Sequence, residues 1–357
     1  MSQRSALRAI LQGEHPAELC QFEWGYWGET LERWRLEGMP AELQPWEACG
    51  ITYYDRVPVQ TRMFPPFESL VLSETEDNRI VRDGNGVIQE VSKHSTAFPR
   101  FLKHPVESLA DFEEMKARLN PDDPGRFPAD WPRIAAALPE RENILLMGGV
   151  EISFFGWPRD LMGVENLLVA YYDQPKLLHA INAYHLEYLK TLYGKLLPAI
   201  DFDFVFIWED MSYKNGPLIS PALVREFMLP YYREFIAFVR ARSDLKILLD
   251  TDGDARQLIP LFLEAGVDGL LPFECAAGMD ICAIGKEYPE LIIAGGLDKR
   301  EIALGRAAID RELESKLPTM FARSRYLPGM DHHVPPEVSY ADFQYYLVKT
   351  REIYEKG

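Results

Sequence analysis

Six short apolar segments, each followed by acidic residues, constrain the fold of this chain more than any other feature. They span residues 143–149, 204–208, 246–249, 269–273, 291–297 and 326–330, and helix-sized stretches separate most of them. Continuous apolar runs of this length are typical of parallel strands that are buried on both faces. Repeated strand–helix alternation predicts an α/β protein, a (β/α)₈ TIM barrel. The active site of such a barrel lies at the C-terminal ends of its strands, where the acidic residues fall.

Composition narrows the class of protein. With 357 residues, 47% apolar and 12% aromatic, the chain can bury a large core, which excludes a disordered protein. Its apolar stretches are shorter than the roughly 20 residues of a membrane span. The first 18 residues resemble an amphipathic helix without the features of a signal peptide. Four cysteines without CxxC spacing favour a reducing compartment, so we expect a cytoplasmic protein.

The formal charge of −17 bears on partners. It opposes binding to nucleic acid and to anionic membranes. A polyanionic ligand would need a local cluster of Arg and Lys to overcome this field.

The chain divides into two regions of one barrel domain. Residues 1–140 form an N-terminal elaboration that includes a helical part, the first barrel elements and a β-hairpin excursion; residues 141–357 form the main βα region. Residues 50–59 read as a strand, and residues 67–91 as two or three antiparallel strands with turns at 76–78 and 83–86. We expect this excursion to cap one mouth of the barrel.

Several later helices carry start and stop signals. Ser220 with Pro221 and Ser339 with Asp342 are typical helix starts. Asp254 is expected to cap a helix over residues 255–265, which ends before a glycine.

The acidic residues at the strand ends are the main candidates for chemistry. Carboxylates crowded at one mouth raise one another's proton affinity unless a cation lies among them, so they suit a divalent metal or a general acid. Some of them can instead cap loops and helices, as Asp298 does if residues 299–302 start a helix. The set is Glu209, Asp210, Asp252, Glu274, Asp298 and Asp331.

Histidine and cysteine side chains follow two of the same strands. His332 and His333 come after the last strand, where an imidazole can bind metal or carry a proton; neighbours in extended chain point to opposite sides, so at most one faces the site. The alternative is a loop histidine bonded to backbone. Cys275 next to Glu274 can be a thiolate ligand, or a buried and inert thiol.

Cations and aromatic residues near the strand ends are candidate substrate contacts. Arg159, Lys214 and the pair Lys299–Arg300 can hold a carboxylate or phenolate, or form structural ion pairs. Some aromatic residues can form walls for a flat ligand, and the others belong to the core. The aromatic set is Trp24, Tyr26, Trp27, Tyr53, Tyr54, Trp208 and Tyr213.

Four long motifs together carry a family resemblance. WEDMSYKNGPLISP, DTDGDARQLIPLFLEAGVDGLLPFE, AGGLDKR and LPGMDHHVPPEVSYADFQYY resemble the uroporphyrinogen decarboxylase superfamily, and FEWGYWGETLERWRLEGMP is similar to one branch of it. The resemblance covers nearly the whole chain. It implies a (β/α)₈ barrel with an N-terminal elaboration. It also implies one of two activities, that of the tetrapyrrole decarboxylases or that of the cobalamin-dependent methyltransferases, which use zinc.

Departures from the family patterns separate these activities. The arginine-containing MRQAGR-like motif of the decarboxylases is absent, and the acidic mouth would repel their substrate, although Asp55 matches the region of their catalytic aspartate. The thiol-activating methyltransferases bind zinc through His-X-Cys and a distant Cys, where this chain has Asp250-Thr251-Asp252 and Met330-Asp331-His332. Oxygen and imidazole ligands would make zinc a stronger Lewis acid, which suits the activation of a methyl ether.

The resulting hypothesis is a corrinoid-dependent methyltransferase, the substrate-specific O-demethylase component. It moves a methyl group from a small methyl ether, expected to be aromatic, to a corrinoid protein; a homodimer is possible. Asp331 is assigned a supporting role. The remaining assignments are Glu209, Asp210, Lys214 and Asp298 as catalytic residues, Arg159, Trp208 and Tyr213 as substrate-binding residues, and Asp252, Glu274 and His332 as zinc ligands.

Two alternatives stay open at this point. The first is a decarboxylase of tetrapyrrole biosynthesis, which needs neither metal nor corrinoid. The second is a non-catalytic tetrapyrrole-binding protein, against which stands the lack of a DxHxxG-type cobalamin motif.

Overall fold

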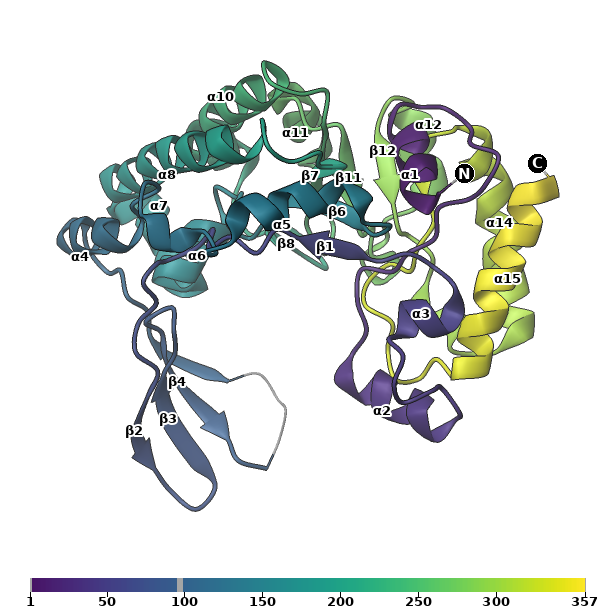
Figure 1. Ribbon diagram of the computed structural model, residues 1–357, viewed down its shortest axis with the longest axis horizontal. Helices are drawn as coiled ribbons and strands as arrows, with labels where there is room; N and C mark the ends of the chain where they lie inside the picture. The colour runs from purple at the N-terminus through teal and green to yellow at the C-terminus, as the bar shows by residue number, and fades with distance from the viewer. Residues whose placement is uncertain (1, 95–98, 357) are drawn as a thin grey trace.

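A curled parallel sheet of seven strands forms the centre of the molecule in the computed structural model, which describes residues 2–94 and 99–356 (Figure 1). The order across the sheet is β1-β6-β7-β10-β11-β12-β13, so neighbours follow the order of the chain. The strands are β1 (Tyr54–Arg56), β6 (Ile144–Gly149), β7 (Phe204–Trp208), β10 (Lys246–Asp250), β11 (Gly269–Leu271), β12 (Ile292–Ala294) and β13 (Tyr326–Leu327). The predicted TIM-like α/β fold is thereby confirmed.

The place of an eighth strand, between β13 and β1, holds an irregular segment. Residues 20–27 run there, and the Gln21 carbonyl accepts a hydrogen bond from the Thr52 amide (3.1 Å). On the other side, the Val334 amide donates to the Gly25 carbonyl (2.9 Å). These bonds are too sparse for a continuous ladder, so within the described residues the sheet has seven paired strands where eight were predicted.

Side chains of the parallel strands alternate between two apolar clusters. Phe204, Phe206 and Leu248 point into the lumen of the curled sheet, where they pack with helix α1 (Gln3–Leu11). Val205 and Ile207 belong to the larger cluster between the sheet and the surrounding helices. This alternation, a property of every β-strand, decides which strand-end residue faces the mouth.

Helices cover the outer face of the sheet, and both the N-terminal and the C-terminal parts of the chain also contain helices (Figure 1). The N-terminal region contributes α2 (Gly28–Leu36), α3 (Pro45–Cys49), α4 (Leu109–Met115) and α5 (Trp131–Ala137), with 3₁₀ turns at Lys116–Arg118, Pro124–Arg126 and Leu138–Glu140. The βα region contributes α6 (Gly156–Met162), α7 (Val164–Asp173), α8 (Pro175–Leu196), α9 (Pro221–Phe227), α10 (Leu229–Arg240), α11 (Ile259–Ala265), α12 (Ile281–Glu287), α13 (Lys299–Ile302), α14 (Arg306–Ala322) and α15 (Tyr340–Lys356), with a 3₁₀ turn at Cys275–Ala277. Among the described residues, none of the helices combines the length and apolar character that crossing a bilayer requires.

The predicted helix signals act as expected with one exception. The Ser220 hydroxyl accepts from the Leu223 amide (3.3 Å), and Gly266 ends α11 in the left-handed conformation (φ 101°). Asp254, however, binds the amide and guanidinium of Arg256, and α11 begins only at Ile259. The predicted cap is wrong because this local pairing uses the carboxylate.

A separate antiparallel sheet carries the β excursion. It contains β2 (Leu70–Glu74), β3 (Asn78–Arg82), β4 (Ile88–Ser92) and β5 (Arg100–Lys103) in that order. The first three are the strands predicted for residues 67–91, and β5 adds a fourth beyond that segment. Figure 1 shows this sheet projecting from the body of the protein instead of folding over the curled sheet, so the predicted cap over a barrel mouth is not seen. A short hairpin of β8 (Ser212–Tyr213) and β9 (Gly216–Pro217) completes the strands.

Candidate active site at the strand ends

The alternation of side chains sorts the strand-end residues into two groups. Trp208 continues the lumen row of β7 after Phe206, and Asp250 continues the lumen row of β10 after Leu248. Glu209 and Thr251, one position further, continue the rows that face the helices. The lumen row alone leads to the mouth.

Three carboxylates, Asp210, Asp252 and Glu274, lie near Asp250 at the ends of β7, β10 and β11. Burial raises the pKa of Asp250 well above its ordinary value, and the charges of Asp252, Asp210 and Glu274 raise it further. Of the predicted acidic residues, Asp210, Asp252 and Glu274 therefore do lie close together at the strand ends. Asp250 directly follows the apolar run 246–249 but is not in the set of candidate residues predicted from the sequence, although its alternation with Leu248 places it in the lumen.

His332 provides the counter-charge. Its Nε2 lies 3.5 Å from Oδ2 of Asp252, and its ring stacks on that of Trp27 (centroids 6.3 Å apart). The hydrogen bond to Asp252 raises the pKa of His332 against the opposing effect of burial. His333 differs, because burial lowers its pKa and its ring occupies the space where a Cβ of residue 25 would be, 2.7 Å from Nε2. The preference for His332 over His333 thus agrees with the placement of the two rings.

Arg159 connects two of the predicted residues. Its guanidinium donates to the carbonyl (2.7 Å) and the carboxylate (2.9 Å) of Asp210, and lies 4.4 Å from the centroid of the Trp208 ring. Burial raises the pKa of Asp210, which Arg159 opposes and Asp252 reinforces. Arg159 thereby makes a cation–π contact with Trp208 at the mouth.

Glu209 does not reach the mouth, contrary to its predicted catalytic place. Its carboxyl is fully buried and accepts from the amides of Phe154 (2.7 Å), Phe155 (2.8 Å) and Gly156 (2.7 Å), and from the hydroxyl of Tyr232. Burial raises its pKa to about 7 in spite of these bonds. Because its strand position faces the helices, Glu209 holds the start of α6 against β7.

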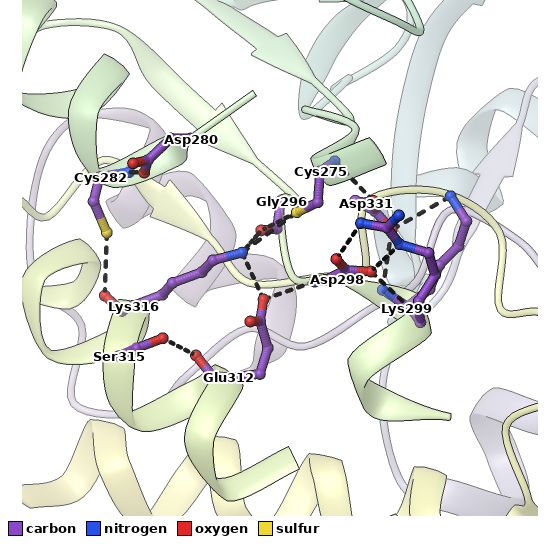
Figure 2. A network of polar contacts seen from close by, with 12 residues as sticks. Cys275, Asp280, Cys282, Gly296, Asp298, Lys299, Glu312, Ser315, Lys316 and Asp331 are labelled. Carbon is purple, nitrogen blue, oxygen red and sulfur yellow. Dashed lines mark hydrogen bonds and ion pairs between the residues drawn. The ribbon is translucent and has the colours of Figure 1, made fainter. Parts of the chain in front are cut away.

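Asp298 and Asp331 also act as supports (Figure 2). Asp298 caps α13 by accepting from the Arg300 amide (2.9 Å) and pairs with the Arg300 guanidinium, so it takes the helix-capping role and not the predicted catalytic one. Asp331 is buried and accepts from the amides of Cys275 (2.9 Å) and Lys299 (3.1 Å), which joins the segments that follow β11, β12 and β13.

Cys275 lies in the same network (Figure 2). Its sulfur is 3.3 Å from Nζ of Lys316, and burial raises its pKa to about 12. It therefore remains a thiol at neutral pH, which agrees with the inert alternative.

Tyr213 and Lys214 lie at the tip of the β8–β9 hairpin. The hairpin backbone packs against residues 252–254, and a Cβ at Gly253 would approach the Tyr213 carbonyl to 2.6 Å. The Tyr213 side chain is 73% exposed and Lys214 is exposed as well. The catalytic role predicted for Lys214 and the substrate-binding role predicted for Tyr213 stay predictions.

The predicted zinc ligands do not form a ligand set. Asp252 and His332 face one another, but Glu274 accepts from the Gly253 amide (2.9 Å) and lies 3.6 Å from Nζ of Lys299. Within residues 2–94 and 99–356, no three His, Cys, Asp or Glu side chains are placed to hold a metal ion. Structural and catalytic zinc sites use at least three protein ligands, so the residues as arranged do not fit zinc.

Two large cavities lie away from this mouth. One of about 620 Å³ is lined by Arg8, Asp201 and Lys246 at the opposite, N-terminal ends of β7 and β10. The other, of about 580 Å³, lies between the antiparallel sheet and α4. The candidate site thus rests on converging side chains at an open mouth.

Comparisons with known proteins agree on the fold. The family model described as uroporphyrinogen decarboxylase (URO-D) matches residues 85–352. No curated protein sequence matches the chain. A methyltransferase from Methanosarcina mazei has a similar structure with a TM-score of 0.58 and 16% identity, over 99% of this chain and 98% of the other. A structure described as a vitamin-B12-independent methionine synthase from Listeria monocytogenes has a TM-score of 0.37 and 12% identity over 96% and 95% of the two chains, too low to support an argument.

Proposed function

Because the chain belongs to the uroporphyrinogen decarboxylase family, we propose that it is the methyltransferase member of a corrinoid system, an O-demethylase. It takes the methyl group of a small aromatic methyl ether and passes it to a corrinoid on a partner protein. The observation that carries this proposal is the His332–Asp252 pair, which keeps a proton at the mouth beside the ring of Trp27.

The surroundings of the pair support a flat, uncharged reacting group. The rings of Trp27 and Trp208 provide planar surfaces near the mouth. The likeness in fold to a methanogen methyltransferase agrees with the proposal but does not extend to its substrate.

The chemical step is the cleavage of the bond between the methyl carbon and the ether oxygen. The electron pair of this bond stays on the oxygen, which becomes a phenol when it accepts a proton. His332 donates that proton, and the negative charge of Asp252 keeps the imidazolium available near neutral pH. The corrinoid of the partner would supply the nucleophile that accepts the methyl group. No step passes through zinc, since the residues do not assemble its ligands.

Methyl transfer is tested with free cob(I)alamin and 2-methoxyphenol as a first probe. We expect one catechol for each corrinoid methylated. The variant His332→Gln should lose about 10²- to 10⁴-fold in rate, the usual contribution of a general acid. The matched control is His333→Gln, whose ring fills space near Gly25 and should affect the rate little. Absence of transfer from every member of a panel of aryl methyl ethers, or an unaffected His332→Gln variant, would contradict the proposal.

Decarboxylation is the second candidate, because the matched family model is described by that activity. A porphyrinogen with many carboxylates must, however, enter a mouth that already holds Asp210, Asp250, Asp252 and Glu274. Release of CO₂ from uroporphyrinogen, without methyl transfer, would establish it in place of the first.

A further inference from the structure

Strand β1 ends with a cation that faces the mouth. Tyr54, two residues earlier, packs against the lumen cluster, and the alternation along the strand puts Arg56 on the same side. Arg56 is exposed, although it lies on the lumen side of the sheet. The mouth of the curled sheet is therefore open at this point.

Arg56 forms no hydrogen bond or ion pair with the part of the chain that the structure describes, residues 2–94 and 99–356. Two other cations at the strand ends, Arg159 and Lys299, are already engaged. Arg159 is paired with Asp210, and Lys299 lies 3.6 Å from Glu274 and 3.4 Å from Asp331. An unpaired guanidinium in a chain of charge −17 is a site where an anion gains a partner.

The backbone beside Arg56 is shaped to fit the guanidinium. A Cβ at Gly149, the last residue of β6, would lie 3.1 Å from Cζ, Nη1 and Nη2 of Arg56. These equal distances mean that the guanidinium lies flat across the backbone. Its face is covered, and its N–H donors at the edge stay free for a planar, bidentate acceptor such as a carboxylate.

Aromatic rings line the lumen next to β1. Tyr54 donates to the Trp24 carbonyl (2.8 Å), and Trp24 stacks on Phe206 (centroids 5.5 Å apart, 16° between planes). Burial raises the pKa of Tyr54; the charge of Arg56 opposes the shift and that of Asp250 adds to it, so both charges reach this ring. The surroundings suit an aromatic body that carries one acidic group.

We propose that Arg56, held flat over Gly149, binds a carboxylate of the substrate, so that the methyl donor is an aryl methyl ether with a single carboxylate. The methyl ether in this inference rests on the proposed methyl transfer. The carboxylate does not, because it is inferred from Arg56 alone. One guanidinium neutralises one carboxylate. A polycarboxylate would leave charges uncompensated among the acidic residues of the mouth.

The test measures binding by calorimetry, without corrinoid and without turnover. The probes are 3-methoxybenzoate and its neutral counterpart 3-methoxybenzyl alcohol. The variants are Arg56→Gln, Arg56→Lys and, as a matched control, Arg141→Gln. Arg141 pairs with Asp55 (3.0 Å), outside the lumen, so its replacement removes the same charge from a neighbouring position. Because Arg56 is exposed and unpaired, its variants should fold, which a thermal melt verifies.

We expect Arg56→Gln to weaken binding of 3-methoxybenzoate by about 10- to 100-fold, the loss of a charged hydrogen-bonded contact. Arg56→Lys should retain part of the affinity for 3-methoxybenzoate. Arg141→Gln should bind 3-methoxybenzoate about as tightly as the wild type does. The affinity for 3-methoxybenzyl alcohol should be little changed by Arg56→Gln. Failure of the wild type to bind 3-methoxybenzoate, or an equal affinity in Arg56→Gln, would overturn the proposal. Methyl transfer from neutral ethers in the Arg56→Gln variant would, in that event, leave the proposed function standing. If the protein binds 3-methoxybenzoate through Arg56 but transfers no methyl group, the proposed methyl transfer is refuted and the carboxylate site at Arg56 is supported.

Discussion

Replacing Glu209 with glutamine should change how the stability of the protein depends on pH. Burial raises the pKa of Glu209 from its ordinary 4.5 to about 7. Between these two pH values the folded protein holds a proton that the unfolded chain has lost, so the free energy of unfolding falls as the pH rises. At about 1.4 kcal/mol for each tenfold change, the contribution of this one group is about 3 kcal/mol.

The variant Glu209→Gln cannot titrate at this position. Its amide nitrogen meets backbone N–H groups that now have one acceptor fewer, which costs about 1–3 kcal/mol at every pH. We therefore expect the variant to be about 1–3 kcal/mol less stable than the wild type at pH 5. By pH 8 the difference should have shifted by about 3 kcal/mol in favour of the variant, so that the gap closes or reverses. Other buried acids, such as Glu23 with a pKa raised to about 7 by burial, are common to both proteins and cancel in the comparison.

Urea denaturation followed by tryptophan fluorescence at pH 5, 6, 7 and 8 measures this gap. Glu42→Gln, at an exposed side chain between α2 and α3, is the control and should leave the pH dependence unchanged. A gap between Glu209→Gln and the wild type that stays constant or widens with pH would refute the assignment of Glu209 as a buried support.

Three further predictions concern the mouth and the base of the barrel. The rate of methyl transfer should fall as the pH rises through the pKa of His332, and Asp252→Asn should move this fall to lower pH, because the hydrogen bond that raises the pKa is weakened; an unmoved pH–rate profile would count against the pair. Asp203→Ala should cost about 3–5 kcal/mol in urea denaturation, because the buried carboxylate binds Arg4 (2.7 Å) and the Leu145 amide (2.7 Å) and so holds α1 in the lumen; a loss below about 1 kcal/mol would contradict this role. Chelator-treated and zinc-supplemented protein should transfer methyl groups equally, and activation by stoichiometric zinc would contradict the conclusion drawn from the ligand geometry.

The sequence predicted the strands well where apolar runs are bounded by charged residues. Residues 204–208 match β7 at both ends, and residues 246–249 match β10 apart from the added Asp250. The segment over residues 20–27 could not be recognised as filling the eighth place. It mixes aromatic with acidic residues and glycine, and its hydrogen-bond partners lie far along the chain.

The candidate site was predictable only in part. Adjacency in sequence suggested that Glu209 and Asp210 share a role, but strand alternation turns Glu209 toward the helices and leaves Trp208 in the lumen. The same rule, applied to the sequence, would have placed Asp250 and Arg56 at the mouth. The pairing of His332 with Asp252 depends on loops that follow different strands, and no local pattern encodes that distance.

The most direct test of the His332–Asp252 pair is an NMR titration of His332 in the wild type and in Asp252→Asn. The His332 signal is assigned by its loss in His332→Gln. We expect a pKa above the ordinary 6.5 in the wild type and a clear decrease in the variant. A wild-type pKa at or below 6.5 that the Asp252→Asn replacement leaves unchanged would contradict the claim that this pair keeps a proton at the mouth of the barrel.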